Sequence, residues 1–426
     1  MLAKTFAVNA VVRLLSALIG LFSVPLLIRV LGVEEYGLWV TLTSIIGWLV
    51  LLDFGVGHAL KNTVARAVAN ESYMLAQAEA QQVFKLTFFI ALAVVICLCV
   101  ATYHVDFIKR NKSLIMMLYL PVLFAFPMSM GGMILQGVRR SHVQSLIGLL
   151  APIVTFFILL YFVVCGESIS LQMYAPIYAV LLVLTWGAYW LVGCAYIKCG
   201  GKKFFLGIVS SKIRTQRLAV GLRFFILQAS SIILYSAGSY LIYSYLGAKE
   251  AAVYDTVNKL YFFGLSLFNM IVAVFWPEIT FNAERMQFER VRRIYFTMLG
   301  LGLMFVLGAF FVAYFSVDII YYWTAGKITV DNKTPYFFAV LVSVQALAYC
   351  GAVVLNAVEK VTGQLLISIL SSMAMIPIFF VFLSMDYGIA SVPIAASLLT
   401  AIAMLYCNLS AYFYVRKGLK VTGCAS

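Results

Sequence analysis

Long apolar segments separated by short polar breaks run through the whole of this 426-residue sequence. A helix needs about 20 mostly apolar residues to cross the hydrocarbon core of a bilayer. Twelve segments come close to or exceed that length, at residues 7–30, 37–60, 83–103, 114–138, 146–165, 173–196, 218–245, 251–275, 293–316, 335–356, 365–385 and 388–414. The runs are continuous rather than alternating, which excludes a transmembrane barrel. The sequence therefore predicts an all-α polytopic membrane protein with about 12 transmembrane helices.

The composition supports the same class. Hydrophobic residues make up 64% of the chain and charged residues 11%, against about 45–50% and 25% in soluble domains. The first apolar run is too long for a cleaved signal peptide and contains Arg13, so we expect it to be retained. Almost no sequence is left for a soluble domain.

The formal net charge of +14 could suggest a nucleic-acid partner. Basic residues of membrane proteins, however, collect in cytoplasmic loops. If the N-terminus is cytoplasmic, most of the 30 Lys and Arg fall in the cytoplasmic loops and ends of the twelve-span arrangement. We therefore expect no nucleic-acid partner, and an even number of spans that leaves both termini in the cytoplasm.

A short motif near the start of the chain returns in its second half. LGVEEYGLW at Leu31–Trp39 is echoed by LGAKEAAVY at Leu246–Tyr254, 215 residues later. The longest cytoplasmic loop follows the sixth apolar run and carries six basic residues. These features predict an N-terminal six-helix lobe (1–200), an inter-lobe loop (201–217) and a C-terminal six-helix lobe (218–426), related as parallel repeats.

Two charges in the first two apolar runs are costly unless each has a partner, water or a route to the interface. Arg13 lies in the first run and Asp53 in the second, at depths that would allow them to pair. Either the two form a structural ion pair, or they mark a charged cavity wall or an ion or proton site. Under the offset of 215, Phe268 stands where Asp53 does, so this acid is not a repeated feature.

A second polar group lies in the eighth run. Asp255 and Lys259 are spaced i, i+4 and so share one face of a helix, with Asn258 beside them. They form either a self-neutralised pair or a site in which Lys259 and Asn258 face a central cavity. Arg223, near the start of the seventh run, is a further candidate, although snorkelling to the headgroups would also account for it.

No catalytic or metal site is evident in the sequence. No two of the eight cysteines have CxxC spacing, and the three histidines are scattered, so we expect no metal or cofactor. A phosphate-binding GxxxxGK[ST] motif is absent. We predict that the chain is not an enzyme.

The N-terminal region resembles the polysaccharide transport proteins, the Wzx-type oligosaccharide flippases of the multidrug/oligosaccharidyl-lipid/polysaccharide exporter superfamily. The resemblance rests on Asn9, on PLLIRVLG from Pro25 to Gly32, on EYGLW from Glu35 to Trp39 and on LLDFGVG from Leu51 to Gly57. It is strongest over the first 70 or so residues, and the predicted twelve-span layout extends it less specifically along the chain.

This resemblance implies two six-helix lobes around a central cavity in a bacterial inner membrane. It implies alternating-access transport of polyprenyl-pyrophosphate-linked oligosaccharide repeat units from the cytoplasmic to the periplasmic leaflet. This transport would serve the synthesis of O-antigen, and so of lipopolysaccharide, or of another surface polysaccharide. Basic cavity residues of relatives are thought to meet the pyrophosphate, a role that chemistry and depth suggest for Arg13 and Lys259. Expected partners are this lipid, membrane lipids, H⁺ or Na⁺ acting through Asp53 or Asp255, and a polysaccharide polymerase complex.

Two other functions remain open from the sequence. A cation-coupled exporter of small drugs or metabolites would favour an acidic cavity, whereas three intramembrane bases here face two acids. A membrane scaffold or polymerase subunit is the third class, and the absence of a long outer loop counts against the polymerase.

Overall fold

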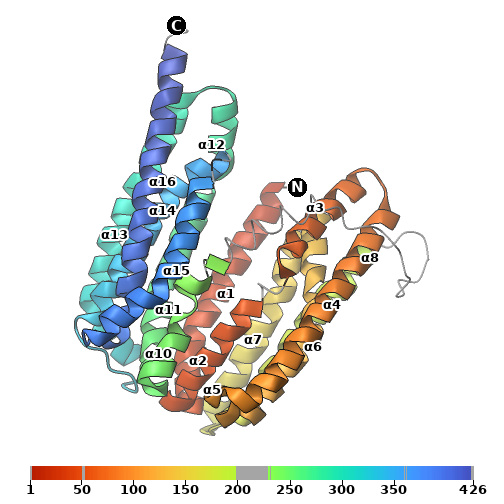
Figure 1. Ribbon diagram of the computed structural model, residues 1–426, viewed down its shortest axis with the longest axis vertical. Helices are drawn as coiled ribbons and strands as arrows, with labels where there is room; N and C mark the ends of the chain where they lie inside the picture. The colour runs from red at the N-terminus through yellow and green to blue at the C-terminus, as the bar shows by residue number, and fades with distance from the viewer. Residues whose placement is uncertain are drawn as a thin grey trace. The chain divides into compact units, whose positions relative to one another are not determined.

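The computed structural model describes residues 2–49, 53–197, 229–230, 232–358, 360 and 362–423, and no β-strand occurs among them (Figure 1). The predicted all-α class is confirmed. The helices are α1 (Leu2–Leu31), α2 (Val33–Trp48), α3 (Val56–Ala69), α4 (Tyr73–His104), α5 (Asp106–Arg110), α6 (Lys112–Gly137), α7 (Ser141–Cys165), α8 (Leu171–Ile197), α10 (Gly238–Leu246), α11 (Ala248–Ala273), α12 (Phe275–Glu284), α13 (Phe288–Trp323), α14 (Thr334–Ala357), α15 (Thr362–Ser384), the 3₁₀ turn η2 (Gly388–Ala390) and α16 (Ser391–Gly423).

Ten helical segments within the described residues are long and apolar enough to cross a membrane. They establish a multi-pass membrane protein. Two predicted runs, 37–60 and 218–245, are not among these segments of the described residues. The first is divided between α2 and α3, and much of the second lies outside the described residues, with α10 covering its end.

The prediction of one continuous helix over 37–60 is wrong. Helix α2 ends at Trp48 and α3 begins at Val56. Between them, Phe54 and Gly55 have φ of 45° and 76°, in the left-handed region that interrupts a right-handed helix. The apolar pattern continues through this break, which is why hydropathy alone did not reveal it.

The repeated LG motif forms the same turn twice. Gly32 separates α1 from α2 with φ 84° and ψ 167°, and Gly247 separates α10 from α11 with φ 99° and ψ 177°. Only glycine adopts this region of φ and ψ without strain. The sequence echo thus reflects one backbone conformation used at equivalent points in the two halves.

The offset of 215 residues persists beyond this turn. Helix α4 begins at Tyr73 and α13 at Phe288. Each start follows a residue with positive φ, Glu71 at 55° and Met286 at 57°. The two halves therefore share a backbone plan up to the third predicted span of each, although their side chains differ.

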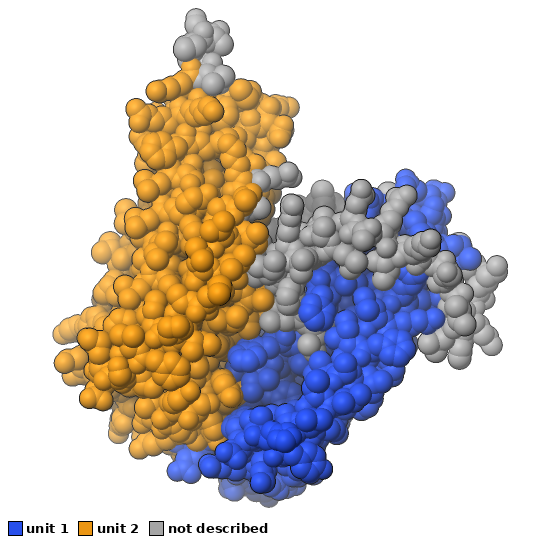
Figure 2. All heavy atoms as spheres, viewed as in Figure 1, with its two compact units in different colours: residues 1–35, 42–228 blue, residues 36–41, 229–426 orange. Residues whose placement is uncertain are grey.

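The chain forms two compact units, coloured separately in Figure 2. Unit 1 comprises residues 1–35 and 42–228, and unit 2 comprises 36–41 and 229–426. The predicted inter-lobe loop, 201–217, lies outside the described residues. Six residues of α2 thus belong with the second half of the chain, which the sequence did not predict.

Each unit contains a buried helix held by close glycine contacts. In unit 1, a Cβ at Gly131 of α6 would collide with the α8 backbone at Tyr189 and Trp190. In unit 2, a Cβ at Gly351 of α14 would collide with the α16 backbone at Cys407. Small residues let membrane helices approach closely, and this packing is a main source of their association.

Candidate functional site

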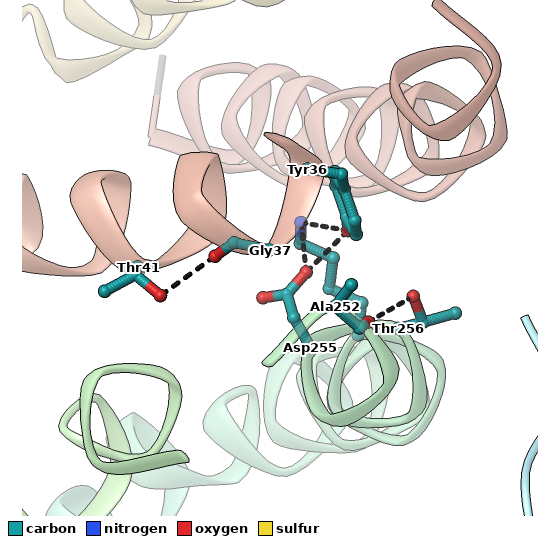
Figure 3. A network of polar contacts seen from close by, with 7 residues as sticks. Tyr36, Gly37, Thr41, Ala252, Asp255 and Thr256 are labelled. Carbon is teal, nitrogen blue, oxygen red and sulfur yellow. Dashed lines mark hydrogen bonds and ion pairs between the residues drawn. The ribbon is translucent and has the colours of Figure 1, made fainter. Parts of the chain in front are cut away.

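Three polar side chains of unit 2 form a closed cluster (Figure 3). The Tyr36 hydroxyl, from the first turn of α2, donates a hydrogen bond to Asp255 Oδ2 over 2.6 Å. Lys259 Nζ lies 2.7 Å from the same oxygen and donates to the Tyr36 hydroxyl over 3.1 Å. The ion pair that the i, i+4 spacing allows is present, with Tyr36 as its third member, and a role of Lys259 in a transport cavity stays a prediction.

The three side chains of the cluster differ in their exposure to solvent. Tyr36 is fully buried, whereas the side chains of Asp255 and Lys259 are 11% and 36% exposed. A carboxylate in an apolar environment is costly unless it is paired and hydrogen-bonded, and here one oxygen receives both partners. An ammonium has three N–H donors, so the two bonds named above leave Lys259 with a third donor.

Close approach of two helices makes this cluster possible. A Cβ at Gly37 would overlap the Ala248 carbonyl group at the start of α11, so only glycine fits there. Thr41, one turn later, donates its hydroxyl to the Gly37 carbonyl over 2.9 Å and approaches the Ser239 carbonyl at 3.4 Å. These contacts hold the first turns of α2 against α10 and α11, with Tyr36 beside Asp255.

Asn258 lies next to Lys259 in the sequence and is half-buried. Its Oδ1 atom is buried and has no hydrogen-bond partner in the part of the chain that the structure describes. Buried polar atoms are almost always hydrogen-bonded. The unmatched oxygen of Asn258 and the remaining donor of Lys259, on successive residues of α11, are each candidates for contact with a ligand.

Asp53 has a different environment from the one predicted. It is 3% exposed and accepts hydrogen bonds from the backbone N–H of Gly55 (2.8 Å) and Gly57 (3.2 Å). These amides belong to the N-terminal end of α3, where negative charge is favoured by the helix dipole. Asp53 thus caps the helix that begins after the break.

The other candidates are not brought to these sites. Arg13 is exposed on α1, and no ion pair of the described residues joins it to Asp53. Arg223 lies outside the described residues. Among the described part of the chain, no three His, Cys, Asp or Glu side chains gather as a metal site would require.

Sequence reasoning missed the part played by Tyr36. The tyrosine was noted only within the EYGLW motif, and a tyrosine at the start of an apolar run is usually an interfacial residue. Its separation from Asp255 by 219 residues hides the contact. The nearest signal in the sequence is the echo of the LG turn, because that turn places the starts of α2 and α11 in equivalent positions.

The fold and the site define a multi-pass α-helical membrane protein with two units and an internal ion-paired cluster. Residues 2–281 match the family described as "Polysaccharide biosynthesis protein". This match covers well over half of the chain, and the protein belongs to that family. The resemblance inferred from the sequence is confirmed.

Two relatives carry more specific names. An O-antigen export protein of Yersinia pseudotuberculosis is 21% identical over 334 residues, which cover 72% of each chain. An O-antigen transporter of Salmonella typhi is 21% identical over 356 residues, covering 79% of this chain and 78% of the relative. Both names are those of transport proteins.

Solved structures share the fold at low sequence identity. An inward-facing multidrug resistance MATE family transporter of the MOP superfamily aligns with a TM-score of 0.75 at 14% identity, covering 97% of this chain and 99% of that one. The lipid II flippase MurJ in an inward closed conformation aligns with a TM-score of 0.73 at 15% identity, covering 94% and 87%. These likenesses show that the chain has the two-lobe helical fold of those proteins.

Proposed function

We propose that this protein is an alternating-access flippase for polyprenyl-pyrophosphate-linked oligosaccharide repeat units. It moves them from the cytoplasmic to the periplasmic leaflet of the inner membrane, for O-antigen or another surface polysaccharide. The observation that carries the proposal is the family match over residues 2–281, together with two relatives named for O-antigen transport. The two-lobe transporter fold is compatible with alternating access.

Lys259 is the group that we assign to the pyrophosphate. Its ammonium is a compact charge on a flexible stem, and it retains a donor after its bonds to Asp255 and Tyr36. A pyrophosphate in a membrane protein requires such a cation, since an unpaired phosphate cannot enter hydrocarbon. The unmatched Asn258 oxygen would accept a hydrogen bond from a hydroxyl group of the sugar. Arg13, exposed on α1, is a second proposed cation.

We assign structural roles to the two acids. Asp53 stabilises the start of α3 through two backbone amides, and Asp255 orients Lys259. Coupling of transport to H⁺ or Na⁺ through either acid stays a prediction, as does association with a polysaccharide polymerase complex.

Export of small cationic drugs is less well supported. The likeness to MATE transporters is at 14% identity and concerns the fold alone. The partly exposed member of the cluster is a cation rather than an acid, and a cation repels positively charged drugs.

A reconstituted flipping assay tests the proposal directly. Purified protein in proteoliposomes should move a labelled polyprenyl-pyrophosphate oligosaccharide between leaflets faster than protein-free liposomes do. Lys259→Ala should lose most of this rate, whereas Lys249→Ala, an exposed lysine on the same helix, should keep it. Transport of organic cations without movement of the lipid would overturn the proposal, and equal rates in the two variants would remove Lys259 from it.

A further inference from the structure

A pocket of about 490 Å³ lies between α13 and α16 in unit 2 (helices labelled in Figure 1). Two arginines, three aromatic rings and two aliphatic side chains line it. Helix α13 contributes Arg292, Tyr295 and Phe296, and α16 contributes Tyr412, Arg416 and Leu419 among others. The spacings of three and four residues place each set on one helix face. This pocket shares no residue with the cluster around Lys259.

Contacts on either side fix the walls of the pocket. The Tyr295 hydroxyl donates to the Asn408 side chain over 3.0 Å and to its carbonyl oxygen over 3.2 Å. One turn beyond the pocket, the rings of Phe288 and Tyr414 meet at 5.7 Å. Gly418 permits this approach, because a Cβ there would overlap the Phe288 ring. The two arginines are thus carried on helices that pack directly together.

Ion pairs among the described residues neutralise little of the positive charge of the pocket. Arg292 has one carboxylate neighbour, Glu289, at 3.5 Å, and both side chains are more than half exposed, so this pair contributes little. Arg416 is in no ion pair recorded for the described residues. Four more basic residues lie within a few positions on the same helix ends: Arg290, Arg293, Lys417 and Lys420.

The pocket is also apolar on one side. Phe296 and Tyr412 are 51% and 42% exposed, so about half of each of these two pocket-lining rings is left uncovered by the protein. The basic helix ends lie where the distribution of Lys and Arg predicts the cytoplasmic surface. Basic pockets between transmembrane helices on that side are suited to the headgroups of anionic lipids.

We propose that this pocket binds an anionic phospholipid of the cytoplasmic leaflet. Its phosphate lies between the guanidinium groups of Arg292 and Arg416, which match phosphate geometry through paired N–H donors, and an acyl chain lies along Phe296 and Leu419. Free phosphate would satisfy the arginines but leave these apolar side chains uncovered. The proposal is independent of what the protein transports.

Native mass spectrometry of the delipidated full-length protein in detergent tests this inference. Titration with phosphatidylglycerol should show one tightly bound lipid, and phosphatidylcholine with the same acyl chains should bind more weakly. Replacing both arginines, Arg292→Gln with Arg416→Gln, should weaken phosphatidylglycerol binding by about tenfold or more, given the usual contribution of each basic residue at a membrane surface. Glu289→Gln should strengthen binding, because it removes the competing carboxylate.

Matched controls separate a built site from general attraction to positive charge. Arg290→Gln with Lys417→Gln removes the same charge from the same two helices, outside the pocket, and should retain tight binding. Leu419→Trp keeps both arginines but fills the apolar side, and should also weaken binding. Equal loss in the two double variants would overturn the proposal, as would displacement of the lipid by equimolar inorganic phosphate or pyrophosphate. Because all these variants alter exposed or half-buried side chains, gel filtration suffices to check that they fold.

Discussion

Lys259 Nζ lies 2.7 Å from Asp255 Oδ2, one turn along the same helix, and Tyr36 from the first half of the chain closes the contact. The arrangement neutralises a carboxylate within a membrane-spanning segment and leaves the ammonium partly accessible. The effect of the cluster on stability and its effect on transport can be measured separately, because each of its three residues can be changed alone.

Lys259→Ala should leave Asp255 buried with only the Tyr36 hydrogen bond. We expect both reduced surface polysaccharide in a complemented deletion strain and a lower free energy of unfolding, because an unpaired buried charge is destabilising. Lys259→Ala with Asp255→Asn removes the charge penalty and should recover stability without recovering polysaccharide. If the double variant recovered both the stability and the surface polysaccharide, the role of Lys259 would be only structural.

Tyr36→Phe removes one hydroxyl and keeps the ring. Asp255 and Lys259 remain paired, so we expect a loss of about 1.5–3 kcal/mol in the free energy of unfolding, the usual range for a hydrogen bond to a charged group. Thermal unfolding in detergent measures this. Tyr245→Phe provides the control, since Tyr245 is an exposed tyrosine of the same unit. Equal stability of the two variants would contradict the role given to Tyr36.

Gly247→Ala tests the conformation of the repeated turn. No atom lies near the position of the added methyl group, so the change isolates backbone strain at φ 99° and ψ 177°. We expect a cost of about 1–3 kcal/mol. Gly300→Ala, which also meets no neighbouring atom but has no positive φ, should cost nothing measurable. The same comparison can be made at Gly32 in the first half of the chain.

Substitutions of Asp53 test whether its carboxylate stabilises the start of α3 by accepting hydrogen bonds from the two backbone amides. Asp53→Ala removes both acceptors and should reduce the free energy of unfolding by about 0.5–2 kcal/mol, the usual value of a helix cap. Asp53→Asn keeps an acceptor oxygen and should retain most of the stability and normal flipping. A stable Asp53→Asn variant that no longer flips lipid would instead support ion coupling through this carboxylate.

Exchange of Arg13 and Asp53 distinguishes the predicted pair from the observed geometry. A structural ion pair would survive the exchange, and polysaccharide synthesis would be restored relative to either single change. The hydrogen bonds of Asp53 to Gly55 and Gly57 predict the opposite, because an arginine cannot accept from those amides. Surface polysaccharide in the double variant decides between the two.

Much of the fold could be predicted from local sequence. Membrane-length apolar runs gave the class, and the two LG turns gave the duplication, since a glycine-only backbone conformation leaves a mark on the sequence. The pairing of Asp255 with Lys259 was also predictable, because four residues make one helical turn.

Other features depended on contacts between distant segments. The break at Asp53 was hidden because the apolar pattern runs through it, and the acid was given Arg13 as a partner when its actual partners include backbone amides two and four residues away. Tyr36 could not be found, because nothing local tells which of 25 tyrosines meets a carboxylate 219 positions later.

The sequence by itself determined that this chain is a multi-pass helical membrane protein with an internal repeat, because span length and glycine-only turns are properties of short segments. Tertiary structure alone decided that residues 36–41 join the second unit, and that Tyr36 completes the ion pair on α11. The physical reason is the close approach at Gly37. Only after two helices meet there do their polar side chains acquire partners.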